Sequence, residues 1–375
     1  MRFAHISDLH IGKRVNDFSM LEDQRYILDE IIKIITQQKA DAVLVAGDIY
    51  DKTQPSAEAV ALCDDFFYAL AELDKHIFII SGNHDCPERI AYGARIMENC
   101  KFHIASVYNG NIKKVSLSDE EGQVNVYLLP FIKPAVIRPY FENERIESYN
   151  DALRAVIEKA GLCRDERNVL VAHQFVTGAS RCDSEDITVG TLDNVDVNIF
   201  DGFDYVALGH IHGPQQAGRP EVRYCGSPLK YSFSEIKQQK SVTIADVKKS
   251  GVEIKTIPLE PKRQMRRLKG AFDELAQVQQ HLFNNDDYMY ITLTDEQDIP
   301  DAIGRLRTFY PNIMKLDYDN VRTRGERAEF DRQAEQSRER QPLEMFEELY
   351  ELQNNQPMDE QQRTYIKKII EEIWT

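Results

Sequence analysis

The sequence contains no apolar run that approaches the roughly 18 residues that a membrane-spanning helix needs. Its opening, MRFAHISDLH, also lacks the basic and then apolar layout of a secretory signal peptide, and it predicts a β-strand instead. With 42% hydrophobic and 29% charged residues, the chain has the composition of a soluble globular protein. We therefore expect a cytoplasmic protein that has no membrane-spanning segment.

Closely spaced cysteine pairs are also absent. The chain has six cysteines, and no two of them form a CxxC pair. This scattered spacing excludes a dense disulfide framework and the usual structural zinc motifs. We expect reduced, buried thiols and assign no function to any of them: Cys63, Cys86, Cys100, Cys163, Cys182 and Cys225.

Basic residues are few relative to acidic ones. The 46 lysines and arginines stand against 62 aspartates and glutamates, which gives a net charge of −16. Because phosphate contacts favour a basic surface, this balance by itself argues against nucleic-acid binding. However, carboxylates that hold divalent cations count as negative in the sequence although the loaded site is positive, and a partner could supply more positive charge.

Short apolar runs alternate with amphipathic stretches from residue 2 to about residue 214, a pattern typical of a layered α/β domain. Residues 21–38 and 56–73 carry apolar side chains at helical spacing. Two later runs, KSVTIADV and GVEIKTIPL, complete a first domain that we expect to span residues 1–260. Six earlier runs predict strands: RFAHIS, DAVLVAG, HIFIIS, VNVYLLP, RNVLVAH and YVALGH.

The composition changes after residue 260. The segment PKRQMRRLKG, residues 261–270, carries five basic residues and no acidic one, and we interpret it as a linker. Helix, strand, helix and strand patterns follow, so residues 261–323 predict a small α+β domain. Residues 324–341 almost lack apolar side chains and predict a flexible connector. Residues 342–375 predict two amphipathic helices, which are too short to bury their apolar faces alone.

Polar side chains follow five of the predicted strands. Ligand sites in open α/β sheets lie at the carboxyl ends of strands, so these five turns could converge on one crevice. Each residue also has a plainer interpretation, as a satisfied buried histidine or a helix-capping aspartate, and singly the plainer one is more common. The residues, in the motifs SDLH, GDIYD, GNHD, AHQ and GHIH, are Asp8, His10, Asp48, Asn83, His84, Asp85, His173, His210 and His212.

The joint occurrence of these residues favours a metal centre. Five of the nine histidines lie directly at predicted strand ends. Asp48 ends a nearly continuous apolar strand, where an unpaired charge is costly unless it binds a partner or a metal. Carboxylate and amide oxygens together with imidazoles, and without a thiolate, suit a pair of borderline-hard cations such as Mn²⁺.

The ordered motifs D-x-H, G-D, G-N-H-D, H and G-H-x-H extend over roughly 210 residues and resemble those of the calcineurin-like metallophosphoesterases. Within this superfamily, the SDLHIGK start and the GSP at residues 226–228, followed by SFSE, are similar to the nuclease subunits that repair DNA double-strand breaks. The resemblance implies an α/β fold, a four-layer β-sandwich flanked by helices. It also implies a small α+β capping domain at residues 261–323 and a C-terminal helical hairpin.

The resemblance further implies roles for individual residues. Two divalent cations would share Asp48 as a bridging ligand and activate water for attack on a phosphodiester. His84 would lie at the scissile phosphate, and Asp85 could orient His84 by accepting a hydrogen bond from its ring. Archaeal relatives carry a histidine where this chain has Asp51, so we assign Asp51 no catalytic role. The first cation would also be held by Asp8, His10 and His212, and the second by Asn83, His173 and His210.

The appendages have functional and plainer interpretations. The basic run Lys262–Lys269 could contact the DNA backbone or form a solvated edge. The resemblance implies that the C-terminal hairpin binds the coiled-coil base of an ABC-type ATPase, in a heterotetramer that contains two copies of this chain. The alternative is that the hairpin packs against its own domain. An apolar stripe suits either interpretation: Leu343, Phe346, Leu349 and Leu352.

Three functions remain open from the sequence. The first is an ATPase-gated, Mn²⁺-dependent DNA exonuclease and endonuclease that processes DNA ends and hairpins in repair, recombination and replication. The second is a phosphoprotein phosphatase or small-nucleotide phosphodiesterase, which would not need the long extension after the last motif. The third is a mainly structural subunit that bridges DNA ends, against which the complete ligand set argues.

Overall fold

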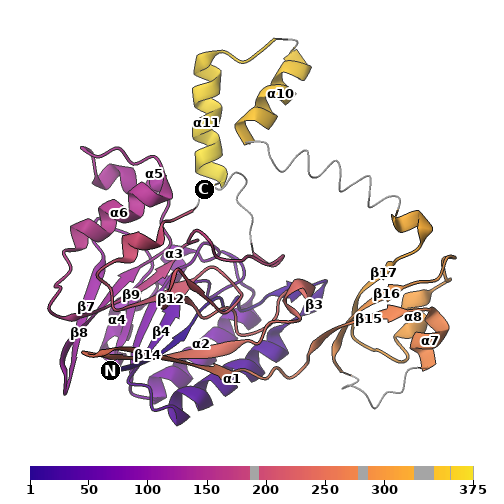
Figure 1. The fold of residues 1–375 in the computed structure, drawn as a ribbon, viewed down its shortest axis with the longest axis horizontal. Helices are drawn as coiled ribbons and strands as arrows, with labels where there is room; N and C mark the ends of the chain where they lie inside the picture. The colour runs from indigo at the N-terminus through magenta and orange to yellow at the C-terminus, as the bar shows by residue number, and fades with distance from the viewer. Residues whose placement is uncertain (186–193, 278–285, 325–341, 355, 375) are drawn as a thin grey trace.

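The computed structural model describes residues 1–375 except 186–193, 278–285, 325–341, 355 and 375 (Figure 1). Two six-stranded sheets form the large domain. In the first sheet, four strands run parallel and two antiparallel strands extend one edge. The spatial order is β14 (Gly251–Pro258), β13 (Ser241–Lys248), β1 (Arg2–Ile6), β4 (Ala42–Ala46), β5 (His76–Ile80) and β6 (Phe102–Ala105).

The second sheet has four parallel strands between two antiparallel edge strands. Its inner face packs on the first sheet through fully buried side chains such as Phe3, Phe78 and Val171. Strands buried on both faces are apolar throughout, which explains the continuous runs in the sequence. The spatial order is β11 (Gln215–Ala217), β12 (Arg219–Tyr224), β10 (Tyr205–Gly209), β9 (Arg167–His173), β8 (Gly122–Leu129) and β7 (Lys113–Asp119).

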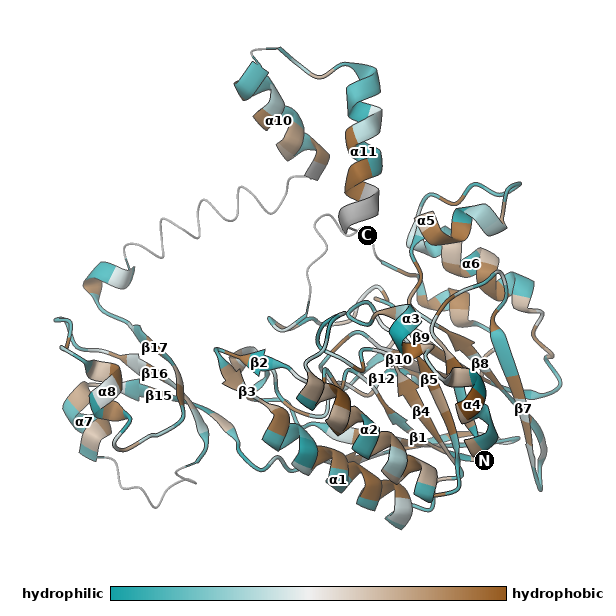
Figure 2. Ribbon diagram, turned by 180° about the vertical axis from the view of Figure 1, so that it is seen from behind, coloured by the Kyte–Doolittle hydropathy of each residue, from teal (hydrophilic) through white to brown (hydrophobic). Residues whose placement is uncertain are grey.

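Helices cover the outer face of each sheet, and their apolar stripes face inward (Figure 2). The first sheet carries α1 (Leu21–Gln37) and α2 (Ala57–Glu72), and the second carries α6 (Tyr149–Ala160). The side chain of Ser56 caps α2, and Ser148 forms a capping box at the start of α6, which satisfies main-chain N–H groups there. The resulting order of helix, sheet, sheet and helix confirms the predicted four-layer fold.

Short elements fill the connections between the strands. The ribbon of β2 and β3 directly follows the first predicted ligand motif. The others are helical turns in the loops between the main strands. These elements are β2 (Arg14–Val15), β3 (Phe18–Ser19), α3 (Pro87–Ile90), α4 (Ala94–Met97), η1 (Glu98–Cys100), α5 (Pro134–Ile137), η2 (Arg138–Tyr140), η3 (Val197–Phe200) and η4 (Phe233–Glu235).

A separate three-stranded parallel sheet follows the large domain, at the right of Figure 1. Its strands are ordered β15, β16, β17, and they share a hydrophobic cluster with the two helices that connect them. The α+β pattern predicted for this region is therefore present. The elements are β15 (Met265–Gly270), α7 (Phe272–Gln277), β16 (Tyr288–Leu293), α8 (Ala302–Leu306) and β17 (Ile313–Tyr318).

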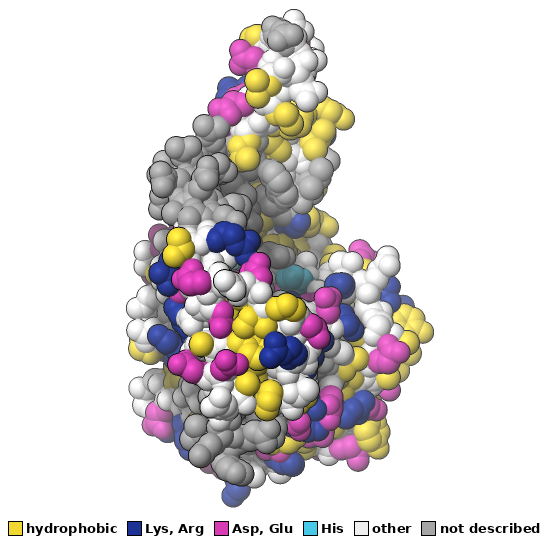
Figure 3. All heavy atoms as spheres, turned by 90° about the vertical axis from the view of Figure 1, so that its right-hand side faces the viewer, with side chains coloured by type: hydrophobic (Ala, Val, Ile, Leu, Met, Phe, Trp, Pro, Cys, Tyr) yellow, Lys and Arg dark blue, Asp and Glu magenta, His cyan; other side chains and the backbone are white. Residues whose placement is uncertain are grey.

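The interpretation of residues 261–270 as a linker is wrong for most of the segment, because Met265–Gly270 forms the edge strand β15. Its buried Met265 is followed by charged positions, and the dense charge conceals the strand in the sequence. Figure 3 shows basic and acidic side chains mixed on this side of the molecule. Four of the five basic residues pair with acidic ones, and Arg267 lies over the ring of Tyr290. The pairs are Lys262 and Arg263 with Glu22, Arg266 with Asp287, and Lys269 with Asp319.

The small domain packs against the start of α1. The hydroxyl of Tyr288 and Nη1 of Arg263 both donate hydrogen bonds to Oδ2 of the buried Asp23, at 2.7 and 2.8 Å. The next residue, Gln24, donates through Nε2 to the carbonyl oxygens of Leu9 at 3.3 Å and His10 at 2.7 Å. The small domain therefore docks beside the loop that carries the first ligand motif.

Two helices, α10 (Pro342–Asn354) and α11 (Glu360–Trp374), form the C-terminal hairpin. Nε of Arg363 pairs with Oε1 of Glu347 at 2.6 Å across the hairpin. Leu349 and Leu352 of the predicted stripe are 53% and 79% exposed, so the large domain does not cover them. Most of the predicted connector lies outside the described residues. Within the described part of the chain, no helix is long and apolar enough to cross a membrane.

Candidate metal centre

The predicted ligand motifs meet at the carboxyl ends of strands from both large sheets. The first sheet contributes the loops after β1, β4 and β5, and the second sheet contributes the end of β9 and the loop after β10. The two sheets are joined at this point, since the main-chain N–H of His210 donates to Oδ1 of Asp8 at 2.9 Å. The expected convergence of the five turns is therefore present.

The main chain of these loops is held in an uncommon conformation. Asp8, His10, Asp48 and His210 have φ angles of 52, 45, 50 and 98°. Residues other than glycine rarely occupy this region, and such strain persists where the surrounding structure imposes it, often at functional sites. Here the first two loops run side by side, with the N–H of His10 donating to the carbonyl oxygen of Asp48 at 3.0 Å.

Two glycines permit the close approach of these loops. A Cβ atom on Gly82 would lie 2.1 Å from Oδ1 of Asp48, and one on Gly209 would lie 1.9 Å from the carbonyl oxygen of Ala46. Neither position has room for a side chain. Gly82 is thus needed to bring the GNHD loop against the GDIYD loop of the same sheet, and Gly209 to bring the GHIH motif against β4 of the other sheet.

One group of potential ligands contains Asp8, His10 and His212, whose ligand atoms lie within 4.8 Å of one another. The Nε2 atoms of His10 and His212 are 3.0 Å apart, and Nε2 of His10 is 3.6 Å from Oδ2 of Asp48. All four side chains are buried. This group has the two imidazoles and the carboxylates predicted for the first cation.

A second group contains Asp8, Asp48 and His173, again within 4.8 Å. Nε2 of His173 lies 3.3 Å from Oδ2 of Asp48 and 2.9 Å from Oδ1 of Asn83. Nδ1 of His210 lies 3.0 Å from the same Asn83 oxygen. Asp48 therefore lies beside ligand atoms of both groups, and Asp8 belongs to both; that Asp48 bridges two cations stays a prediction.

The comparison with known families identifies the large domain. The sequence pattern described as calcineurin-like phosphoesterase matches residues 1–214, which include all nine predicted site residues. The chain belongs to the calcineurin-like phosphoesterase family. It is therefore a metal-dependent phosphoester hydrolase. A second pattern, described as type 5 capsule protein repressor C-terminal domain, matches residues 261–354.

Similar proteins extend the match beyond the phosphoesterase domain. The chain is 34% identical over 321 residues to the D subunit of nuclease SbcCD from Staphylococcus epidermidis, across 84% of this chain and 85% of the relative. It is also 34% identical over 320 residues to the protein of the same name from Staphylococcus saprophyticus, across 84% of each. A solved dimetal phosphatase from Danio rerio is 12% identical, with a TM-score of 0.41, over 69% of this chain and 99% of that chain.

Three imidazoles of this phosphoesterase centre are suited to act as ligands. Burial lowers the pKa of His10 and of His212 well below the usual value, and it lowers the pKa of His210 to about 3. These rings are therefore neutral near pH 7 and offer a lone pair. In addition, the buried Nδ1 atom of His10 makes no hydrogen bond.

The protonation of Asp8 and His173 would change when cations bind. Burial, reinforced by the charge of Asp48, raises the pKa of Asp8 to about 7. Burial alone would lower the pKa of His173, but the adjacent Asp48 carboxylate outweighs it and raises that pKa to about 9. Divalent cations would favour the deprotonated form of each ligand. The oxygen and nitrogen donors present thus fit the metals that the phosphoesterase family implies.

His84 lies at the edge of this centre. One of its ring nitrogens is within 4.8 Å of ligand atoms of His10 and Asp48, and its main-chain N–H donates to Oδ1 of Asp48 at 2.9 Å. Its Nδ1 atom is 3.1 Å from the carbonyl oxygen of Asp51. That carbonyl can only accept a hydrogen bond, so Nδ1 carries the proton in this contact.

Asp85 makes hydrogen bonds that the sequence did not predict. Its carboxylate accepts hydrogen bonds from the main-chain N–H groups of Ile49, Tyr50 and Gly82, at 3.2, 3.0 and 2.9 Å. These bonds join the GDIYD and GNHD loops, because three adjacent N–H groups satisfy the buried carboxylate of Asp85. That Asp85 also orients the ring of His84 stays a prediction.

Several residues around the centre were not found from the sequence. Ser184, Glu185, Glu235 and Lys240 surround His212 and form hydrogen bonds to it or to one another. The SFSE motif, which ends in Glu235, was the available signal, but it gave no indication of which ligand it contacts.

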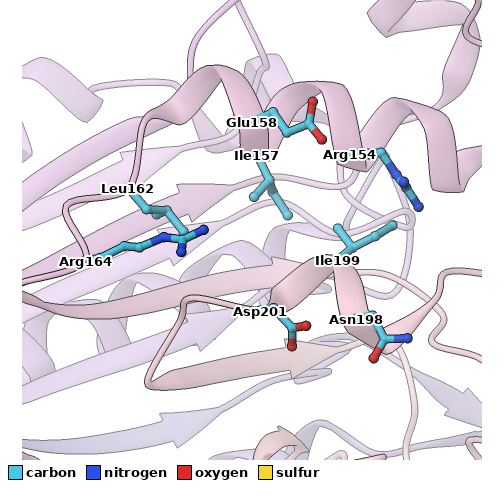
Figure 4. Close-up of a pocket in the computed structure, with 8 residues that line it drawn as sticks. All are labelled: Arg154, Ile157, Glu158, Leu162, Arg164, Asn198, Ile199 and Asp201. Atoms are coloured by element: carbon cyan, nitrogen blue, oxygen red, sulfur yellow. The ribbon is translucent and has the colours of Figure 1, made fainter.

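A separate open pocket lies between α6 and η3, on the outer side of the second sheet (Figure 4). Basic and acidic side chains both line it, and none of the nine predicted site residues does. The chemistry of the phosphoesterase centre therefore does not involve this pocket. Its lining residues include Arg154, Glu158, Arg164 and Asp201.

Proposed function

We propose that this chain is the nuclease component of an SbcCD-type complex, a Mn²⁺-dependent DNA exonuclease and endonuclease that processes DNA ends and hairpins. The observation that carries this proposal is the convergence of the full ligand set in a chain that resembles the D subunit of nuclease SbcCD over 84% of its length. A minimal phosphatase would need the large domain alone. The match instead continues into residues 261–354.

The two ligand groups would hold two divalent cations that share Asp48. Such a pair supplies Lewis-acid activation of water and neutralises the charge of the phosphate. The donor set of oxygens and neutral imidazoles favours Mn²⁺ among the available ions. Asp8, His10 and His212 would complete one site, and Asn83, His173 and His210 the other.

His84 would act on the substrate rather than on the metals. Its contact with the Asp51 carbonyl fixes the ring through Nδ1, beside the Asp48 ligand that both cations share. From there, an imidazolium could donate its other proton to the leaving oxygen or stabilise the phosphate charge. Asp85 would contribute by holding the loop on which His84 is carried.

The negative charge of the chain bears on how DNA would bind. Four of the five basic residues in the run 262–269 are paired with acidic side chains, which weakens the case for this run as a DNA-binding strip. Exposed pairs of this kind contribute little net positive potential. We therefore assign most of the DNA affinity to the loaded metal centre and to a partner.

That partner would be an SbcC-type ABC ATPase, bound through the C-terminal helices. The exposed stripe at Phe346, Leu349 and Leu352 supports this assignment, since an amphipathic helix with an uncovered apolar face is suited to a groove or coiled coil. Two copies of this chain would join two ATPase copies in a heterotetramer. The corresponding domain boundaries are residues 1–260 for the nuclease, 261–323 for the cap, 324–341 for the connector and 342–375 for the hairpin.

The decisive experiment compares two substrates. The purified chain with Mn²⁺ is incubated with linear duplex DNA and, separately, with a generic aryl phosphate ester, with and without the ATPase. We expect cleavage of DNA, stimulation by the ATPase with ATP, and weak hydrolysis of the ester. Rapid ester hydrolysis without DNA cleavage would assign the chain to the phosphatases instead.

A further inference from the structure

Every polar atom of His212 except one is held by a neighbouring group. Its main-chain N–H donates to Oε1 of Glu185 at 2.6 Å, and its carbonyl oxygen accepts from Nζ of Lys240 at 2.8 Å. Ring atom Nδ1 lies 2.7 Å from Oγ of Ser184. The remaining atom, Nε2, faces Nε2 of His10 at 3.0 Å. The environment of His212 thus points one particular nitrogen into the centre.

A buried chain of polar groups continues behind Ser184. Oγ of Ser184 donates to Oε1 of Glu235 at 2.6 Å, and Oε2 of Glu235 accepts from Nζ of Lys240 at 2.5 Å. Glu235 and Lys240 are 0% and 3% exposed, so water does not compete for these bonds. Oε1 of Glu235 also accepts from the main-chain N–H of Tyr231 at 3.1 Å. The carboxylate is therefore surrounded by donors and acts only as an acceptor.

The direction of these bonds determines where the proton of His212 lies. A serine hydroxyl has one hydrogen, and here that hydrogen is directed to the Glu235 carboxylate. Ser184 can then offer only a lone pair to Nδ1 of His212. Nδ1 must carry the ring proton, and Nε2 is left with its lone pair towards the centre.

We infer that Ser184, oriented by the Glu235–Lys240 ion pair, is a positioning residue that fixes His212 in the tautomer with Nε2 available as a metal ligand. This inference rests on the proposed role of His212 in holding a cation. It also gives a function to the SFSE motif, whose final residue directs the serine hydroxyl. Outer groups of this kind set both the tautomer and the orientation of a ligand histidine.

The first test measures the tautomer directly, without metal or substrate. The full-length chain is labelled with ¹⁵N-histidine and treated with a chelator, and the His212 ring is assigned by comparison with His212→Gln. We expect the nitrogen shifts of a ring protonated at Nδ1. A wild-type His212 ring protonated at Nε2 would overturn the inference, whatever the enzyme cleaves.

The second test measures the affinity for Mn²⁺ by calorimetry. Ser184→Ala removes the hydroxyl that accepts the hydrogen bond from Nδ1 of His212. We therefore expect one of two Mn²⁺ ions to bind about 10–100-fold more weakly. The ¹⁵N shifts of the His212 ring should then indicate mixed tautomers. Ser184→Thr keeps a hydroxyl and should preserve both properties. Ser116→Ala, which removes a hydroxyl of β7 that donates to Asn125 in β8, is the matched control. Unchanged shifts and affinity in Ser184→Ala would refute the inference.

A third variant reverses the direction of the hydrogen bonds that link residue 235, Ser184 and His212. In Glu235→Gln the amide can donate to Ser184, whose hydroxyl is then released to donate to Nδ1 of His212. We expect the Nε2-protonated tautomer to become the major form in this variant. If Glu235→Gln unfolds because Lys240 loses its counterion, the two Ser184 variants decide the question. Loss of nuclease activity in a chain with the expected tautomer would count against the proposed function, and not against this inference.

Discussion

Both ends of the first sheet carry a pair of histidines in contact. At the carboxyl end, Nε2 of His10 lies 3.0 Å from Nε2 of His212, which follows β10 of the second sheet. At the amino end of β5 and within β6, Nδ1 of His76 and Nε2 of His103 are 2.9 Å apart. The two pairs are similar in geometry, yet the structure gives them different surroundings.

The surroundings determine which pair can hold a cation. The buried carboxylates of Asp8 and Asp48 lie beside the first pair, whereas the carboxylates near the second pair, Asp74 and Glu98, are themselves paired with lysines. Among the residues that the structure describes, no third ligand atom completes a metal-binding group with His76 and His103. The contrast shows that histidine proximity alone does not make a metal site, and that the carboxylates at strand ends are the informative feature.

The strongest test of this contrast removes the shared carboxylate. Asp48→Asn keeps the size of the side chain but removes the charge that contacts both ligand groups. We expect fewer than two Mn²⁺ ions per chain, measured by equilibrium dialysis and elemental analysis, and DNA cleavage reduced about 10³-fold or more. Asp246→Asn, the same change in a residue that pairs with Arg2 in this sheet, should retain both ions. Two tightly bound ions in Asp48→Asn would show that Asp48 is not the bridge.

A smaller effect is expected when the metals remain and the substrate-facing histidine is changed. We predict that His84→Gln binds two Mn²⁺ ions but cleaves linear DNA about 10²–10⁴-fold more slowly, as for the loss of a general acid. His103→Gln is the control at the other histidine pair and should cleave at the wild-type rate. Wild-type cleavage by metal-loaded His84→Gln would remove His84 from the mechanism.

The sequence was sufficient to predict the convergence of the candidate ligand residues, the four-layer order and the α+β nature of the small domain. Asp8, His10 and Asp48 follow apolar strands, and that pattern depends only on local chemistry and on the rule that parallel strands end at one edge. The same rule brought His173 and His210 of the second sheet into the prediction.

Other features depend on contacts that no local pattern contains. β15 was missed because its partners, Asp287 and Asp319, are distant in sequence and neutralise a run that looks like a linker. Asp85 follows His84 directly, which suggested a contact between the two. The folded loops also place its carboxylate against the N–H groups of Ile49 and Tyr50, a contact that no local pattern indicates. Pairing across the fold, rather than sequence proximity, decides such roles.

Because the role proposed for the hairpin is association with the ATPase, a change in its apolar stripe should leave the metal centre of the two large sheets intact. Leu349→Glu places a charge in the exposed stripe of α10, and we expect it to weaken binding to the ATPase about 30-fold, measured by calorimetry. Mn²⁺ binding should not change. Val321→Glu, a similar substitution at a 72% exposed position outside the hairpin, is the matched control. Equal ATPase affinity in both variants would exclude this stripe from the interface.

The smallest predicted effect concerns the second histidine pair and the pH dependence of stability. Burial, followed by the charge of His76, lowers the pKa of His103 to about 4. The unfolded chain therefore binds this proton more readily than the folded chain does. The stabilisation is present above pH 6.5, the ordinary histidine value, and is lost as the pH falls from there towards 4.

Because His103 is only half-buried, solvent screening limits its contribution to about 1–2 kcal/mol. We expect the free energy of unfolding of the wild type, measured with denaturant and a chelator, to fall by that much more than that of His103→Gln between pH 7 and pH 4. The histidines of the metal centre titrate in both proteins, so their effect cancels in the difference. Parallel stability curves would mean that His103 is as easily protonated in the folded chain as in the unfolded one. In that case burial would not lower the pKa of His103. The carboxylates of Asp8 and Asp48 would then be the feature that distinguishes the histidine pair at the metal centre from this one.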